Sequence, residues 1–140
     1  MTHATSGYDD DMIDHVTLSV SDLKAARDFY TAALEPLGYE VVLDPEGMVA
    51  FGGPIPGLDG KIPDFFIREG DTAPVHIAFM AMARDQVDGF HAAGVAAGGS
   101  DNGGPGLRPQ YGPGYYAAFV IDPDGNNIEA VMHERVDGQD

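Results

Sequence analysis

An internal repeat with an offset of 61 residues constrains the fold of this chain more than any other feature of its sequence. The aligned pairs are His15 with His76, Val16 with Ile77, Leu18 with Phe79, Phe29 with Phe90, Ala32 with Ala93 and Gly38 with Gly99. Because the matches include aromatic residues at helical spacing and a glycine, we interpret them as a duplication of one structural unit.

The first copy begins with a predicted strand and a predicted helix. Residues 14–20 alternate between polar and apolar side chains, which is typical of a half-buried strand. Ser21 and Asp22 offer an N-cap for a helix with apolar residues on one face, and Pro36 and Gly38 end it. Three more strands are predicted after this helix.

Three short apolar segments complete the first copy, at residues 39–43, 49–51 and 64–67. The last two are separated by a Gly- and Pro-rich stretch, 52–63, that predicts a loop. The first copy is therefore predicted to be a βαβββ unit.

The second copy repeats this order of elements. We predict a strand at 75–81, a helix at about 84–97, and strands at 115–121 and 127–133 joined by a turn at 122–125. A unit of this size has one helix and an open sheet, too little to bury its own apolar face. The two units should therefore pack together.

The predicted fold class is α+β, with two βαβββ modules pairing into an open, cup-shaped mixed sheet that has its helices outside. We expect one domain over residues 1–140, with module one at about 12–69 and module two at about 74–134. The acidic N-terminal tail, 1–10, and the C-terminal tail, 136–140, are predicted to be disordered.

The composition of the chain limits both its expected binding partners and the ligand atoms that a metal site could use. The chain has no cysteine, so a metal must be held by nitrogen and oxygen ligands. A formal net charge of −16 argues against nucleic acid and membrane surfaces as partners. The chain starts with polar and acidic residues and has no apolar run of membrane-spanning length, so we expect a cytoplasmic protein without a signal peptide.

Three residues form a candidate metal site. His15 and His76 occupy the same position in the two copies, and Glu129 lies between apolar residues in the last predicted strand. Two imidazoles and one carboxylate leave coordination positions open, as in sites for Fe(II), Zn, Mn or Ni. Considered alone, each residue could instead be an ordinary strand residue that is hydrogen-bonded or exposed and does not bind metal. The duplication favours the metal site because it relates the two histidines by symmetry.

The chain resembles the vicinal oxygen chelate superfamily, which includes glyoxalase I, bleomycin-resistance proteins, fosfomycin-resistance enzymes and extradiol dioxygenases. The resemblance extends from Ile13 to about Glu134. The segments that carry it are Ile13–Val16 with Phe29 and Tyr30 downstream, His76–Ala78, and Phe119–Glu129.

The resemblance implies metal ligands at His15, His76 and Glu129 and a divalent ion of unknown identity. Glyoxalase I has a fourth ligand, a glutamate, on the last strand of the first module, where this chain has Phe66 or Asp64. On its apolar pattern Phe66 is the better match, so the fourth ligand is expected to be missing.

The resemblance also bears on the reaction. Extradiol dioxygenases have a tyrosine in place of Phe119 and a histidine near Gln110–Gly112, so cleavage of catechols is not expected here. Residues expected to contact substrate are Phe51, Phe66, Arg108, Tyr111, Tyr115 and Phe119. Arg108 is the candidate for an anionic group, although a loop arginine is more often a surface charge.

Two functions follow from this interpretation. The first is a metalloenzyme of lyase, isomerase or transferase type, acting on a small organic substrate, with Glu129 as a candidate for moving a proton. The alternative is a metal-free protein that sequesters a small molecule, as bleomycin-resistance proteins do.

Members of the superfamily pair their modules within one chain or exchange them between two chains. The link from Glu69 to Pro74 is short, and short hinges favour exchange. We therefore predict a homodimer, in which exchange would join His15 of one subunit to the other two candidate ligands of its partner.

Overall fold

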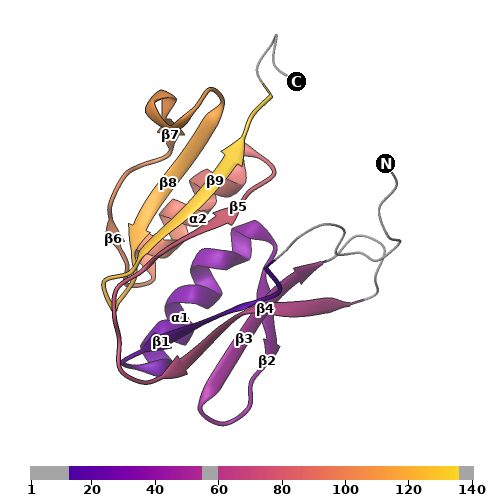
Figure 1. The fold of residues 1–140 in the computed structure, drawn as a ribbon, viewed down its shortest axis with the longest axis vertical. Coiled ribbons are helices and arrows are strands. Elements are labelled where there is room, and N and C mark those ends of the chain that lie inside the picture. The colour runs from indigo at the N-terminus through magenta and orange to yellow at the C-terminus, as the bar shows by residue number, and fades with distance from the viewer. Residues whose placement is uncertain (1–12, 55–59, 136–140) are drawn as a thin grey trace.

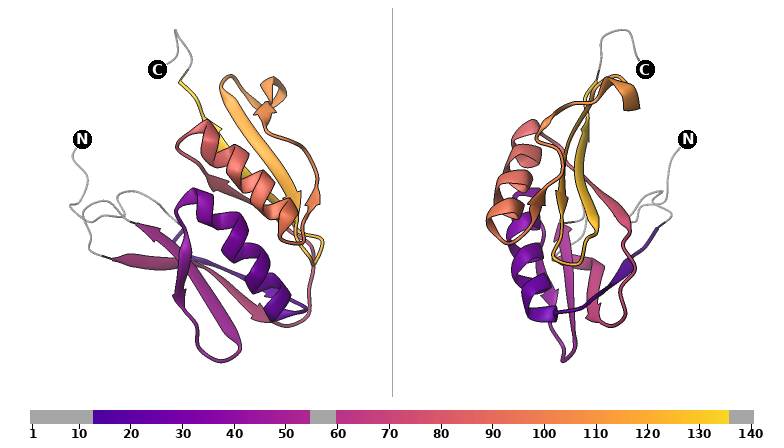
Figure 2. Two further views of the ribbon diagram at one scale, coloured as in Figure 1. Left: turned by 180° about the vertical axis from the view of Figure 1, so that it is seen from behind. Right: turned by 90° about the vertical axis from the view of Figure 1, so that its left-hand side faces the viewer.

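Two mixed β-sheets lie next to each other, and two helices cover the same face of both sheets (Figures 1 and 2). The structure is a computed structural model that describes residues 13–54 and 60–135. The predicted tails, 1–10 and 136–140, lie outside the described residues. The arrangement confirms the predicted α+β class, with the helices on the outer side and the opposite face of the sheets open.

The first module consists of β1 (Val16–Val20), α1 (Leu23–Leu34), β2 (Glu40–Leu43), β3 (Met48–Pro54) and β4 (Lys61–Glu69). Its strand order is β1-β4-β3-β2, with β1 parallel to β4 and the other pairs antiparallel. Asp22 caps α1 as predicted, because its carboxylate accepts a hydrogen bond of 3.1 Å from the backbone N–H of Ala25. Gly38, at a φ of 90°, ends the 3-10 turn Glu35–Leu37 that follows the helix.

The second module consists of β5 (His76–Met80), α2 (Arg84–Ala96), β6 (Ser100–Asp101), β7 (Gly106–Leu107), β8 (Tyr115–Ile121) and β9 (Asn127–His133). Its strand order is β5-β9-β8-β6, with β7 also pairing with β8. The strand β5 is parallel to β9, as β1 is to β4 in the first module. The predicted βαβββ repeat is therefore confirmed; the strand after the helix, β6, has only two residues, and the two-residue β7 is an addition to the repeat.

The predicted loop at 52–63 is shorter than the sequence indicates. The strand β3 continues to Pro54, and β4 already begins at Lys61. Gly52 explains the difference, since a Cβ atom at this position would lie 2.1 Å from the carbonyl oxygen of Ile62. The sequence predicts a turn at Gly52, but its lack of a side chain instead allows β3 and β4 to approach closely.

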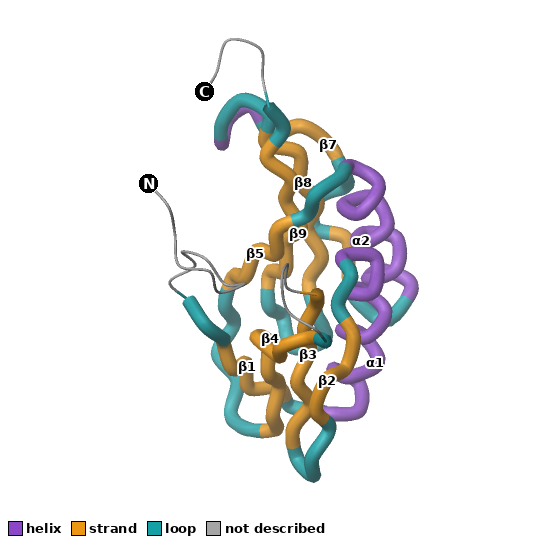
Figure 3. The backbone as a smooth tube through the Cα atoms, turned by 90° about the vertical axis from the view of Figure 1, so that its right-hand side faces the viewer, coloured by secondary structure: helices purple, strands orange, loops and turns teal. Residues whose placement is uncertain are grey.

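The two modules are joined through their helix layer. The helices α1 and α2 lie side by side along one side of the molecule (Figure 3). Small residues permit this approach, because a Cβ atom added at Gly94 would lie 3.5 Å from the Cβ atom of Ala33. Beneath the helices, the ring of Phe79 lies 5.2 Å from that of Phe65 and 5.8 Å from that of Tyr39, so one core spans both modules.

The turn between β8 and β9 forms a second connection between the modules. Asp122 is buried there and accepts a hydrogen bond of 2.5 Å from the hydroxyl of Tyr30 in α1. Asn126 and Asp124 donate three more hydrogen bonds to the same carboxylate. Each oxygen of Asp122 therefore has two donors, and the buried charge is compensated.

We expect Tyr30 to make folding stability unusually sensitive to alkali. Burial, and then the nearby Asp122 carboxylate, raise the pKa of the Tyr30 hydroxyl far above its usual value of 10.0. Its contribution to stability is therefore complete below pH 10 and declines above it, because only the unfolded chain releases the proton. Between pH 10 and pH 11.5, the free energy of unfolding should fall on average about 1 kcal/mol per pH unit more steeply in the parent than in Tyr30→Phe, approaching about 1.4 kcal/mol per pH unit at the upper end. Denaturant titrations at each pH would measure this, and equal slopes would contradict it.

Candidate functional site

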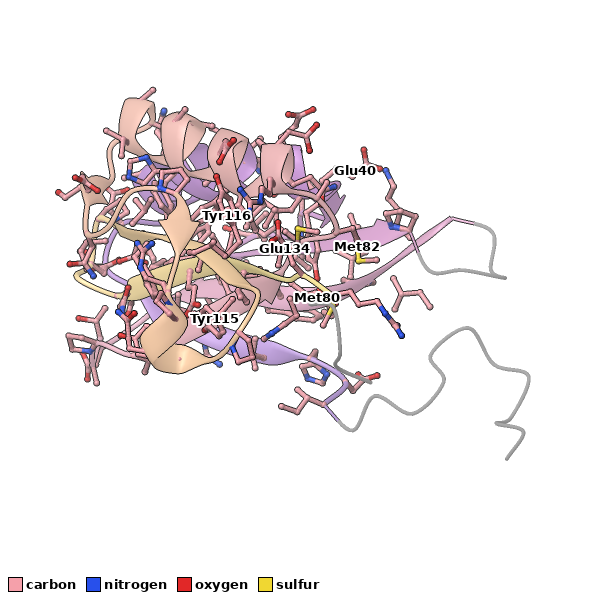
Figure 4. The ribbon with its side chains drawn as sticks, turned by 90° about the horizontal axis from the view of Figure 1, so that it is seen from above. Glu40, Met80, Met82, Tyr115, Tyr116 and Glu134 are labelled. Atoms are coloured by element: carbon pink, nitrogen blue, oxygen red, sulfur yellow. The ribbon has the colours of Figure 1, made fainter. Side chains whose placement is uncertain are left out.

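The open face of the second sheet presents an alternating set of side chains from β8. Tyr116, Ala118 and Val120 face the core, whereas Tyr115 and Phe119 face the open side. Figure 4 shows Tyr115 and Tyr116 on opposite sides of the sheet. This alternation follows from the period of two in a strand and places Tyr115 and Phe119, two of the residues expected to contact substrate, on the open face.

Glu129 is the central polar residue of this face. It is only 1 % exposed, yet it is a carboxylate on a strand between the core residues Ile128 and Ala130. Its Oε1 atom lies 2.9 Å from Nε2 of His76, and its Oε2 atom accepts a hydrogen bond of 2.5 Å from the hydroxyl of Tyr115. Each carboxylate oxygen therefore has its own partner, as a buried charge requires.

The hydrogen bonding of His76 determines how this residue interacts with Glu129. We call these two residues the pair. Its Nδ1 atom lies 3.0 Å from the carbonyl oxygen of Asn127, which can only accept, so Nδ1 carries a proton. In the neutral ring, Nε2 then directs its lone pair at Oε1 of Glu129. Two electron-pair donors at this distance need a positive centre between them, either a proton or a metal cation.

This geometry fits a metal ion. Ligand atoms about 2.1 Å from an ion, with an angle of roughly 90–110° between them, are separated by about 3.0–3.4 Å, close to the observed spacing. Metal-binding histidines typically donate their second N–H to a backbone carbonyl, as His76 does to Asn127. His76 and Glu129 therefore suit a divalent ion with nitrogen and oxygen ligands.

An aromatic pocket of about 320 Å³ surrounds the pair. Its walls are formed by His76, Tyr111, Tyr115, Phe119, Asn127 and Glu129. The Phe119 ring is stacked on that of His76, with 6.3 Å between centroids, and the Tyr111 ring lies 5.4 Å from that of Tyr115. Tyr111 is 61 % exposed, so it stands at the edge of the pocket rather than at its base.

Burial and the Glu129 carboxylate together raise the pKa of Tyr115 to about 12. The hydroxyl therefore remains protonated near neutral pH, where it is the donor in the bond to Oε2 of Glu129. The Tyr115 hydroxyl is therefore the donor and the Glu129 carboxylate the acceptor in this contact.

The structure does not bring His15 to the pair within one chain. His15 is exposed, its Nδ1 lies 2.8 Å from the Asp14 carboxylate, and its ring packs on that of Phe66 at 5.2 Å. No three His, Cys, Asp or Glu residues are placed to hold a metal within residues 13–54 and 60–135. His15 and His76 do border the same cleft, of about 390 Å³, which separates the two modules.

Strand register identifies the counterpart of Glu129 in the first module. Ala78 pairs with Glu129 in the second module, and Thr17, which is 61 residues earlier, pairs with Phe66. Phe66 is therefore the counterpart of Glu129 in the first module, and its side chain cannot coordinate a metal. Asp64 instead accepts a hydrogen bond of 2.9 Å from the hydroxyl of Tyr39.

Two predicted substrate contacts lie elsewhere. Phe51 is 0 % exposed and packs in the core near Tyr30 and Phe65, so it does not line the open face. Arg108 donates hydrogen bonds to the carbonyl oxygens of Gly104 and Gly106 and stacks on the Phe119 ring at 5.4 Å. It is absent from the residues lining the pocket, so it supports Phe119 from the loop instead of facing the pair.

The contact between Tyr115 and Glu129 is the feature of the site that the sequence does not predict. The sequence does contain a signal for it, because a tight turn at 122–125 sets the register of the two flanking strands. In that register Phe119 pairs with Glu129 and Tyr115 with His133, and only the pair Ala117 and Val131 lies between them on the open face. The small Ala117 leaves room for the Tyr115 ring to reach Glu129.

Within the described part of the chain, no helix is long and apolar enough to cross a membrane. A comparison with curated proteins finds no match. Two further comparisons, with protein-family models and with solved structures, do find relatives.

Among solved structures, a glyoxalase/bleomycin resistance protein from Albidiferax ferrireducens is 32 % identical, with a TM-score of 0.72 over 89 % of this chain and 100 % of that chain. A glyoxalase-related enzyme from Fulvimarina pelagi is 19 % identical, with a TM-score of 0.63 over 87 % of this chain and 88 % of that chain. A lactoylglutathione lyase from Agrobacterium tumefaciens is 23 % identical, with a TM-score of 0.58 over 87 % of this chain and 93 % of that chain. The last two likenesses show a shared fold.

The family model of the Glyoxalase/Bleomycin resistance protein/Dioxygenase superfamily matches residues 12–130, nearly the whole of both modules. The repeated βαβββ units agree with this match. The chain therefore belongs to the Glyoxalase/Bleomycin resistance protein/Dioxygenase superfamily.

Proposed function

We propose that this protein is a metal-dependent enzyme acting on a small organic substrate, with chemistry of lyase, isomerase or transferase type. The observation that carries the proposal is the contact of 2.9 Å between Nε2 of His76 and Oε1 of Glu129, while Nδ1 of His76 is committed to a carbonyl. A divalent metal ion bound there would act as a Lewis acid that stabilises negative charge developing on substrate oxygen atoms.

The residues of the pocket supply the other requirements of such a reaction. Tyr111 and Phe119 offer aromatic surfaces for a ring or alkyl group of the substrate. Glu129 is the candidate for moving a proton, which would require Oε1 to be free of the metal, because Oε2 is held by Tyr115. Stacking of Phe119 on His76 fixes the imidazole against the wall.

His15 is proposed to complete the metal site from a second copy of the chain. The modules of one chain meet through their helices, and β1 and β5 remain edge strands on either side of the cleft. Ile13 and Met80 border this cleft and are 76 % and 70 % exposed, an apolar surface that a second subunit would cover. The proposed assembly is a homodimer with two shared sites.

The metal content of the purified protein tests the proposal. Elemental analysis after purification without chelators should find about one divalent ion per chain, and His76→Ala should lose it while keeping the fold. The matched control is His91→Ala, since His91 pairs with Asp101 at 2.8 Å, outside the pocket. Failure of the parent to retain or take up Zn, Ni, Mn or Fe(II) would contradict the proposal.

One observation favours a metal-free binding protein as the second candidate. Both oxygens of Glu129 have partners within the chain, so a doubly protonated His76 would satisfy the pair without a metal. The aromatic pocket would then bind a planar or cationic compound directly. A parent protein without metal that binds such compounds with micromolar affinity would support this alternative.

A further inference from the structure

Tyr115 and Tyr116 are adjacent in β8 and have opposite environments. The hydroxyl of Tyr115 bonds to Glu129 on the open face, and that of Tyr116 bonds to Asp88 of α2 at 2.6 Å on the helix side. Figure 4 shows the two side chains on either side of the sheet. Tyr115 therefore places a hydroxyl at the site, and the neighbouring Tyr116 places one away from it, so Tyr116 can serve as the control residue.

The position of Tyr115 is fixed by more than its hydrogen bond. Its ring contacts those of Tyr111 and His133, at 5.4 Å and 5.2 Å, the latter in an edge-on contact. These two contacts oppose rotation of the Tyr115 ring away from Glu129. The hydroxyl is therefore held at Oε2 of Glu129 by packing as well as by the bond itself.

We propose that Tyr115 is a positioning residue that makes Glu129 a one-oxygen ligand, so that a bound divalent metal contacts Oε1 alone. The inference rests on the proposed function. A free carboxylate can bind a metal through both oxygens, which occupies two coordination positions. With Oε2 held by Tyr115, one of those positions stays open for an oxygen atom of the substrate.

Titration with Co²⁺ alone tests this role without any assay of activity. The full-length parent, Tyr115→Phe and Tyr116→Phe are compared for the dissociation constant of Co²⁺ and for its visible absorption spectrum, which weakens as the coordination number rises. We expect Tyr116→Phe to match the parent in both. Tyr115→Phe should bind Co²⁺ about 10- to 100-fold more weakly, because the carboxylate is no longer oriented. Its spectrum should also weaken, because Glu129 can now bind through both oxygens.

The possible outcomes separate this inference from the function on which it rests. A parent that binds no Co²⁺ overturns both. A parent that binds Co²⁺, with Tyr115→Phe giving the same spectrum, overturns the role of Tyr115 only, even if the affinity falls. Circular dichroism of the three proteins identifies any variant that loses its fold. In that case Tyr115→Trp, which keeps an aromatic ring but cannot place a hydroxyl at Oε2, replaces Tyr115→Phe under the same criteria.

Discussion

Replacement of Asp122 by alanine should destabilise the protein by about 3–5 kcal/mol, because each buried donor left without an acceptor costs about 1–3 kcal/mol. The variant loses the acceptor for the fully buried hydroxyl of Tyr30 and for the side-chain amide of Asn126. It also loses the acceptor for the backbone N–H groups of Asp124 and Asn126. A small domain has a total stability of about 5–15 kcal/mol, so the loss is a large fraction of the whole.

Urea titration of the parent and the variant measures this effect as a change in midpoint at constant slope. Asp124→Ala is the matched control from the same turn. Asp124 accepts hydrogen bonds of 3.1 Å from the backbone N–H of Ser21 at a more exposed position, where water can replace it, so its loss should cost less than about 1 kcal/mol. Equal effects of the two substitutions would contradict a special role for Asp122.

The consequence of this turn extends beyond stability. Asp122 and Asp124 belong to the second module, whereas Tyr30 and Ser21 belong to the first. The turn therefore fixes α1 against the end of the second sheet, and through α1 it fixes the position of β1. His15 directly precedes β1, so the packing of the two modules sets the direction in which His15 faces.

Most of the secondary structure is predictable because the local signals agree with the tertiary structure. Asp22 both reads as an N-cap and acts as one, and alternation in 115–121 places Tyr115 and Phe119 on the correct face. Phe51 is different. Its predicted strand, 49–51, contains only apolar residues, so a period of two cannot indicate which of them faces the core.

The identity of the first-module residue that corresponds to Glu129 also depends on tertiary structure. The pairing of β3 with β4 shifts register between Phe51 and Gly52, so Asp64 falls between the paired residues Pro63 and Phe65. Such an irregularity changes the face that each following side chain occupies. Arg108 lies in a loop whose conformation depends on the carbonyl groups of Gly104 and Gly106, for which the sequence has no periodic signal.

Mixing two variants that each fail to bind metal should restore metal binding if the site is shared between subunits. His15→Ala removes the ligand of one module, and Glu129→Ala removes a ligand of the other. Neither homodimer then has an intact site. After unfolding and joint refolding at equal concentrations, random pairing gives mixed dimers in half of the population, each with one intact site, so about a quarter of all sites should bind metal.

A second mixture serves as the control for this complementation. His76 and Glu129 both belong to the second module and lie 2.9 Å apart within one chain, so His76→Ala mixed with Glu129→Ala leaves every site broken. If neither His15→Ala nor Glu129→Ala binds metal alone, metal binding in the first mixture and none in the second would establish that His15 acts across the subunit interface. If the first mixture also binds none, although the parent binds metal, His15 must reach the pair within its own chain through closure of the cleft between the modules. Light scattering that shows only monomers at micromolar concentration would exclude the shared site directly.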